Sequence, residues 1–144
     1  MSINYLQELL QLIENGTIGK NFPKNSDVGG ILDSRDSNPF DVEWMSAFNE
    51  VECEYKKIEK SVELAALIKK VRETSFKLFY GIASGGELAS YASDDFDLIA
   101  KGICVDSNNE WLSGLLKEYM DGYFPCKSGL KGEVNLREML VERQ

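Results

Sequence analysis

The longest helical pattern in the chain runs from Phe40 to Tyr80, a stretch that holds neither glycine nor proline. Its mainly apolar stripe recurs at alternating steps of four and three from Trp44 to Ala65 and then continues at steps of three or four, the spacing that places side chains on one face of a helix. The stripe comprises Trp44, Phe48, Val51, Tyr55, Ile58, Val62, Ala65, Ile68, Val71, Ser75, Phe79 and, just beyond the stretch, Ile82. This spacing predicts helix and excludes strand.

One helix of roughly 40 residues is long for a globular domain, in which helices average about 11 residues. The residues Glu59-Lys60-Ser61 are a candidate corner, because Ser61 can cap a second helix that begins at Val62. Two antiparallel helices would bury each other's stripes, so we favour the break. Acids precede bases along the run, which would suit the dipole of one unbroken helix; the early acids are Asp41, Glu43, Glu50, Glu52 and Glu54.

The segment before this run predicts one helix and then a long connection. Ser2 can cap a first helix with a broad leucine-rich face, which ends where Asn15-Gly16 supplies a stop. From Gly16 to Pro39 the composition changes to Gly, Asn, Ser and Asp with two prolines. Connections of this length often form binding loops. A short strand or helical turn around 28–33 is compatible with the pattern.

The second half of the chain predicts a turn and at least three further helices. Ser84-Gly85-Gly86 reads as the turn, and 87–91 as a short helix at most. Ser93 would then cap a central helix that is apolar on nearly all sides. The remaining helices are expected over 110–120, capped from the Asp106-Ser107-Asn108-Asn109 link, and over 134–143.

Every strong pattern is helical, and no internal repeat or low-complexity tract occurs, which predicts an all-α fold. An apolar fraction of 43% in 144 residues allows a real core and argues against disorder. We expect residues 1–144 to form a single domain. Its architecture should be a bundle of about six helices with a long loop after the first.

The net charge of −8 limits the partners of the protein. An acidic surface repels nucleic-acid phosphates and anionic lipid heads, so a basic protein or a cation is favoured by sign, although acidity can also serve solubility alone. Three separated cysteines without a C-x-x-C pair fit reduced thiols. No signal peptide or membrane span is recognisable, and we expect a cytoplasmic protein.

Catalytic motifs are missing from the sequence. The chain has no histidine, which excludes Ser-His-Asp and Cys-His arrangements, and it has no phosphate-binding glycine motif. Asp106-x-Asn108-x-Glu110 begins like a calcium loop, but Trp111 and Lys117 occupy the positions of the required glycine and bidentate glutamate. We therefore expect no enzyme, no cofactor and no metal site.

Residues 91–124 form an acidic segment with interspersed aromatic residues, which contains seven acids and only two lysines. The three acids at 94, 95 and 97 are first interpreted as favourable charges in the first turn of a helix, and second as part of a partner-facing patch. Aromatic anchors inside a charged rim are typical of tight interfaces. We expect Phe96 and Trp111 in the core and Tyr123 exposed. The candidate partner-binding residues are Asp94, Asp95, Asp97, Asp106, Glu110, Glu118, Asp121 and Tyr123.

In its size, acidity, cytosolic character and lack of catalytic residues, the chain resembles the small helical immunity proteins of bacterial toxin systems, including those of contact-dependent inhibition. The resemblance extends over the whole chain and rests on no single motif. It implies a non-catalytic inhibitor that binds a cognate toxin domain, and we expect this domain to be a basic nuclease. Alternatives are a secretion chaperone or adaptor, a metal-binding enzyme that uses Asp94, Asp95, Asp97 or Asp106, and a helical structural module.

Overall fold

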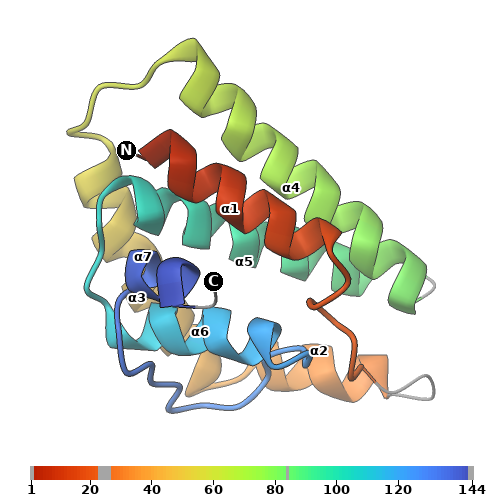
Figure 1. The fold of residues 1–144 in the computed structure, drawn as a ribbon. Coiled ribbons are helices and arrows are strands. Elements are labelled where there is room, and N and C mark those ends of the chain that lie inside the picture. Colours follow the sequence, from red (N-terminus) through yellow and green to blue (C-terminus); the bar gives the residue numbers. More distant parts are fainter. Residues whose placement is uncertain (1, 23–26, 84, 143–144) are drawn as a thin grey trace.

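The structure is a computed structural model that describes residues 2–22, 27–83 and 85–142. These residues form helices and no strands, in agreement with the all-α prediction (Figure 1). The described part contains seven helices, against about six expected: α1 (Ser2–Glu14), α2 (Val28–Asp36), α3 (Phe40–Tyr55), α4 (Val62–Ala83), α5 (Gly86–Cys104), α6 (Glu110–Met120) and α7 (Leu136–Glu142).

The central helix is α5, which contacts α1, α3, α4, α6 and α7. In Figure 1, α4 and α5 run antiparallel, and α1 lies against both of them. One cluster of buried apolar residues draws on all seven helices. The central position expected for the helix around residues 93–105 is confirmed.

The break inside the long helical run is confirmed at the expected place. Helix α3 ends at Tyr55 and α4 begins at Val62, where the Ser61 hydroxyl accepts a hydrogen bond of 3.0 Å from the Leu64 N–H. The break also resets the helical face, because Val62 is 88% exposed while Leu64 is buried. The stripe predicted through Val62 and Ala65 is therefore wrong at those two positions.

Other capping signals also mark helix ends. The side chain of Asn109 accepts a hydrogen bond of 2.9 Å from the Leu112 N–H at the start of α6. Gly16 follows the end of α1 with a φ of 89°, and Gly122 follows α6 with a φ of 94°. Both glycines occupy the left-handed region, which is unfavourable for other residues.

The long loop expected over 16–39 is not confirmed, because residues 28–36 form α2. The Asp27 side chain caps this helix by accepting a hydrogen bond of 3.0 Å from the Gly30 N–H. Two glycines in the first turn lower its helix propensity. Burial of Leu32 and Arg35 against the rest of the fold compensates for that weakness.

The helix start predicted at Ser93 is wrong. Helix α5 begins at Gly86 and continues without a break, so Ser93 is buried in its interior. The reason is packing: Leu88, Ala92 and Ile99 share one continuous buried face, which outweighs the local capping tendency of serine. Residue 84 of the predicted turn lies outside the described residues, as does residue 143 of the predicted last helix, which is observed from Leu136.

Individual burial predictions can also be compared with the structure. Phe96 is fully buried and Tyr123 is exposed, as expected, whereas Trp111 is only partly buried. Cys53, Cys104 and Cys126 are all free thiols, and Cys104 is buried. No helix among the described residues is both long enough and apolar enough to cross a membrane.

Candidate partner-binding surface

Almost the whole net charge of the protein is located in residues 27–55, which form α2, α3 and their short connection. This segment contains eight acidic residues and one basic residue, Arg35, leaving sixteen acids and fifteen bases for the rest of the chain. The segment thus carries −7 of the total of −8. The charge of the protein is therefore strongly asymmetric along the sequence.

Six of these eight carboxylates have no basic partner within 4 Å among the residues that the structure describes: Asp27, Asp33, Asp36, Asp41, Glu43 and Glu50. Some of them accept hydrogen bonds from neutral groups. Glu43 accepts a hydrogen bond from the Gly129 N–H, and Glu50 accepts one from the Asn109 side-chain amide. Their negative charge remains uncompensated.

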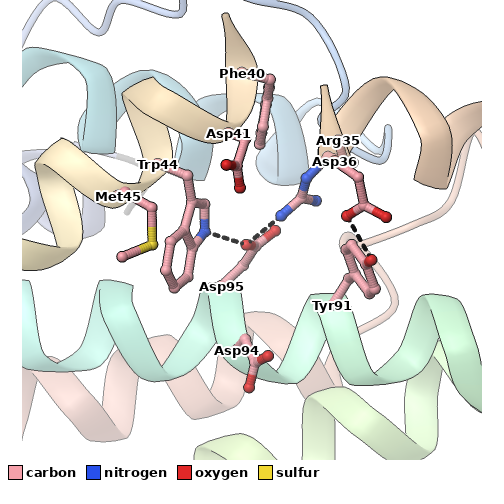
Figure 2. Close-up of a pocket in the computed structure, with 9 residues that line it drawn as sticks. All are labelled: Arg35, Asp36, Phe40, Asp41, Trp44, Met45, Tyr91, Asp94 and Asp95. Atoms are coloured by element: carbon pink, nitrogen blue, oxygen red, sulfur yellow. Dashed lines mark hydrogen bonds and ion pairs between the residues drawn. The ribbon is translucent and has the colours of Figure 1, made fainter. Parts of the chain in front are cut away.

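A pocket of about 190 Å³ opens between α2, α3 and α5 (Figure 2). Its walls include the aromatic side chains of Trp44 and Tyr91, which are both only partly buried. The other lining residues are Arg35, Asp36, Phe40, Asp41, Met45, Asp94 and Asp95. The pocket therefore combines aromatic surface with several carboxylates.

The floor of the pocket is a buried polar network centred on Asp95, which is 0% exposed. Its carboxylate accepts hydrogen bonds from Arg35 Nη2 at 2.6 Å, from Trp44 Nε1 at 2.9 Å and from the Tyr119 hydroxyl at 2.5 Å. These residues come from α2, α3, α5 and α6. The network connects four helices and fixes the position of the Trp44 indole.

Arg35 is held on several sides. Its Nη1 donates to the Pro125 carbonyl oxygen at 3.2 Å, and its guanidinium carbon lies 4.5 Å from the centre of the Phe40 ring. Burial alone would lower the pKa of Arg35, but attraction to Asp95 outweighs this effect and raises it. Arg35 Nε is buried without a hydrogen-bond partner among the described residues. The floor is thus an ion pair with one unused donor.

Tyr119 is the buried hydroxyl of this network. Burial raises the pKa of Tyr119 well above its usual value of 10, and the negative charge of Asp95 raises it further. The phenol is therefore held neutral, as a donor to Asp95. Its ring also packs against Phe96 with 4.6 Å between ring centres, which ties the network to the core.

The rim of the pocket carries the charge. The Tyr91 hydroxyl donates a hydrogen bond of 2.6 Å to Asp36, which raises the pKa of Tyr91 to about 12. Asp41 is exposed, and its carboxylate has no partner among the described residues. Beside the rim, Val42 and Met45 are 57% and 42% exposed. An apolar patch thus adjoins an acidic opening.

The acids predicted from the sequence as a partner-binding group are placed differently. Asp95 lies inside the protein, and each of the other six has a basic side chain within 4 Å. Those pairs are Asp94 with Arg72, Asp97 with Arg72 and Lys101, Asp106 with Arg137, Glu110 with Lys131, Glu118 with Lys127, and Asp121 with Lys117. The residues lie on α5, α6 and the adjoining links, and Asp94 and Asp95 line the same pocket.

Asp94, Asp95 and Asp97 are also not first-turn acids, because they lie in the middle of α5. Asp94 points away from Asp95 in Figure 2, and its ion pair with Arg72 of α4 measures 3.1 Å. Among the described residues, no three side chains of the types His, Cys, Asp and Glu are grouped to hold a metal ion.

Sequence reasoning did not select Asp36, Asp41, Trp44 or Met45 as site residues. One signal was present, because the acids between 41 and 54 precede every base of the helical run. This order of acids and bases would also suit the dipole of one long helix, with acids at its N-terminal end and bases at its C-terminal end. With α3 ending at Tyr55, the same gradient instead separates an acidic helix from a more basic one.

Comparison with known protein families adds an independent finding. The family described as "Immunity protein PIM1" matches residues 8–126 of this chain. The matched range includes all residues that line the pocket and the whole of α2 to α6. None of the curated proteins matches the chain significantly.

Proposed function

This chain belongs to the family of immunity protein PIM1, and we propose that it neutralises a basic, nuclease-like toxin domain by binding to it. Membership of the family gives the protein an immunity role with a toxin as its protein partner. The basic character of that toxin and its nuclease activity are the additional content of the proposal. We further propose that neutralisation takes place in the cytoplasm and needs no catalytic step.

The observation that carries the proposal is the charge of residues 27–55, where eight acids accompany one base that is itself buried. An enzyme that cleaves nucleic acid must attract phosphate groups, so its substrate cleft is positively charged. Complementary potentials accelerate association and favour the correct partner. Fast, charge-steered binding suits a protein that must occupy such a cleft before nucleic acid does.

The surface used for binding is also a proposal. The carboxylates without basic partners on α2 and α3 are available to a basic toxin at once. The acids on α5 and α6 must first exchange an intramolecular ion pair for an intermolecular one, which reduces the gain. We therefore place the centre of the interface on α2 and α3, keep Asp94 at its edge, and leave Asp95 out because its carboxylate is buried.

The first experiment identifies the toxin and measures its activity. The tagged protein is incubated with lysate of its source organism, washed at moderate salt, and the retained proteins are identified by mass spectrometry. A captured toxin domain is then purified and tested on plasmid DNA and on total RNA. We expect cleavage of one substrate and loss of that cleavage at one equivalent of this protein.

Different failures would contradict different parts of the proposal. A toxin that is bound and neutralised but leaves DNA and RNA intact would refute the nuclease assignment while keeping the immunity role. An acidic toxin domain would refute the electrostatic argument. A purified toxin whose activity is unchanged by a molar excess of this protein would not be its target.

A further inference from the structure

We propose that the pocket between α2, α3 and α5 is the anchor site for one arginine or lysine side chain of the toxin domain. The inference deepens the proposed function and rests on it, because it assumes a basic toxin. It assigns recognition to particular residues: Asp36 and Asp41 would bind the cation, and Trp44 and Tyr91 would contact its aliphatic stem and charged end.

The shape of the pocket fits a long, unbranched side chain with a charged end. Its volume of about 190 Å³ is open to solvent, and its aromatic walls come from two different helices, α3 and α5. Cations are attracted to the faces of tryptophan and tyrosine. The Arg35 guanidinium lies 4.5 Å from the centre of the Phe40 ring and 5.5 Å from that of Tyr91, so the partly exposed Trp44 ring is the main aromatic surface for an incoming group, with Tyr91 beside it.

The local charge favours a cation and disfavours an anion. Arg35 is the only positive group in the lining, and it is neutralised by Asp95 at 2.6 Å. Arg72, which lies outside the lining, pairs with Asp94 in the same way. Asp36 and Asp41 therefore give the opening a net negative charge, with only the neutral Tyr91 hydroxyl bound to Asp36.

The binding groups are already fixed in position. The Trp44 indole is held by its hydrogen bond to Asp95 and by stacking on Phe48, with 5.3 Å between ring centres. Tyr91 is held by its hydrogen bond to Asp36. A pre-organised site loses less conformational entropy on binding than a mobile one. Rigid aromatic walls are therefore suited to anchor a partner.

Two neighbouring features support an interface that extends beyond one side chain. Val42 and Met45 form an exposed apolar patch on α3 beside the opening, where the body of a partner can bury them. Arg35 Nε is a buried donor without a partner among the described residues. Because Arg35 lines the pocket, the floor contains a polar group with unused hydrogen-bonding capacity.

The first test needs no toxin. The ¹⁵N-labelled full chain is titrated with the blocked tripeptide Gly-Arg-Gly, and with Gly-Gln-Gly as the uncharged control. We expect the indole N–H signal of Trp44 to shift with the arginine peptide, while Trp111 outside the pocket serves as internal reference. The shift should decrease at least threefold in the Asp36→Asn/Asp41→Asn double variant.

The second test uses the toxin domain captured as described above. Association of the Asp36→Asn/Asp41→Asn variant is compared with that of a Glu14→Gln/Glu59→Gln variant, which removes the same charge from exposed acids outside the pocket. We expect the pocket variant to associate at least tenfold more slowly, and the control variant less than twofold. Thermal melting of both variants checks that the fold is retained.

The outcomes separate this inference from the proposed function. If the toxin binds both double variants as fast as the parent protein, the immunity role stands and the anchor site is wrong. If the arginine and glutamine peptides shift Trp44 equally, or neither does, the cation specificity is refuted. If no toxin binds but Trp44 responds to arginine only, the pocket is a cation site and the proposed function fails.

Discussion

The two acidic regions of this protein differ in how their charges are used. Between residues 91 and 124, each of the seven acids has a basic partner, and one of them, Asp95, lies fully inside the protein. Between residues 27 and 55, six acids have no basic partner among the described residues. The first region uses its acids to join helices, whereas the second leaves them available to another molecule.

This difference shows why a count of charges along a sequence does not locate an interface. The bases that neutralise the 91–124 region come mostly from outside it, for example Arg35 from α2, Arg72 from α4 and Arg137 from α7. Electrostatic potential depends on these tertiary partners. The segment with the most uncompensated charge, not the segment with the most aromatic residues, is the better candidate.

The largest expected effect is on stability, after removal of the buried acid. Asp95→Ala leaves Arg35 as a buried cation without its counter-ion and removes the acceptor of two further hydrogen bonds. Breaking a buried ion pair from one side typically costs about 3–5 kcal/mol. We expect a loss of this size in the free energy of unfolding, measured by urea denaturation.

The matched control for this variant is Asp94→Ala, one position earlier on α5. Asp94 is ion-paired as well, but its side chain is exposed, so we expect a loss below about 1 kcal/mol. In the Asp95→Ala/Arg35→Ala double variant, the two losses should not add, because the second change removes the unpaired charge. Equal effects at 94 and 95 would contradict the buried role of Asp95.

The second prediction concerns alkaline pH and Tyr119. The pKa of Tyr119 is raised in the folded protein, so above about pH 10 the unfolded chain releases a proton that the folded one retains. The contribution of Tyr119 to the free energy of unfolding is therefore constant below pH 10. It decreases as pH rises beyond 10, by up to about 1.4 kcal/mol per pH unit for one proton.

Tyr119→Phe separates this effect from the other tyrosines. The variant should be less stable than the parent protein at pH 7, because Asp95 loses a hydrogen bond, and its stability should fall less steeply above pH 10. Thermal melting of the parent protein and of the variant between pH 8 and 11 gives the change of stability with pH for each. Identical slopes would show that Tyr119 does not carry the alkaline loss.

The third prediction compares the two acidic regions in binding. Asp41→Lys places a positive charge at the pocket rim, so association with the toxin domain should slow by more than tenfold at low salt, equivalent to about 1.4 kcal/mol. Asp121→Lys makes the same change at an acid that is paired with Lys117. Stopped-flow association should show less than a threefold effect there, and a larger effect at Asp121 would reverse the assignment.

The smallest expected effect is at Lys101, which joins the two regions. Its ammonium group binds Glu52 of α3 at 2.9 Å and Asp97 of α5 at 3.2 Å. Lys101→Met should cost about 1 kcal/mol of stability, as is usual for partly exposed pairs. The toxin association rate should change less than twofold. A larger change in the rate would place this edge of α3 in the interface.

Local signals in the sequence predicted much of the fold. The caps at Ser61 and Asn109 and the stop after Glu14 gave correct helix ends, because a capping side chain acts within three residues of itself. The all-α class followed from the spacing of apolar residues. Helix α2 was expected as part of a long loop, with at most a short strand or helical turn around 28–33, because its glycines favour a loop. Burial of Leu32 and Arg35 stabilises the full helix in addition to the Asp27 cap.

The candidate site depends on contacts that the sequence does not reveal. Arg35 and Asp95 are 60 positions apart, and Asp95 stands between two other acids that gave the appearance of an exposed cluster. The capping interpretation of Ser93 had the same origin, because a serine before three acids is typical of a helix start. Helix α5 nevertheless continues through Ser93, because residues on both sides of Ser93 are buried in the core.

The central claim is that a toxin domain binds the surface of α2 and α3 around the pocket, and hydrogen exchange tests it most directly. Amide exchange is measured by mass spectrometry for the protein alone and in complex with the captured toxin domain. We predict slower exchange in residues 33–45 and around Tyr91, with α6 and residues 121–133 unchanged. Protection confined to α6 and residues 121–133, with 33–45 unchanged, would contradict the account.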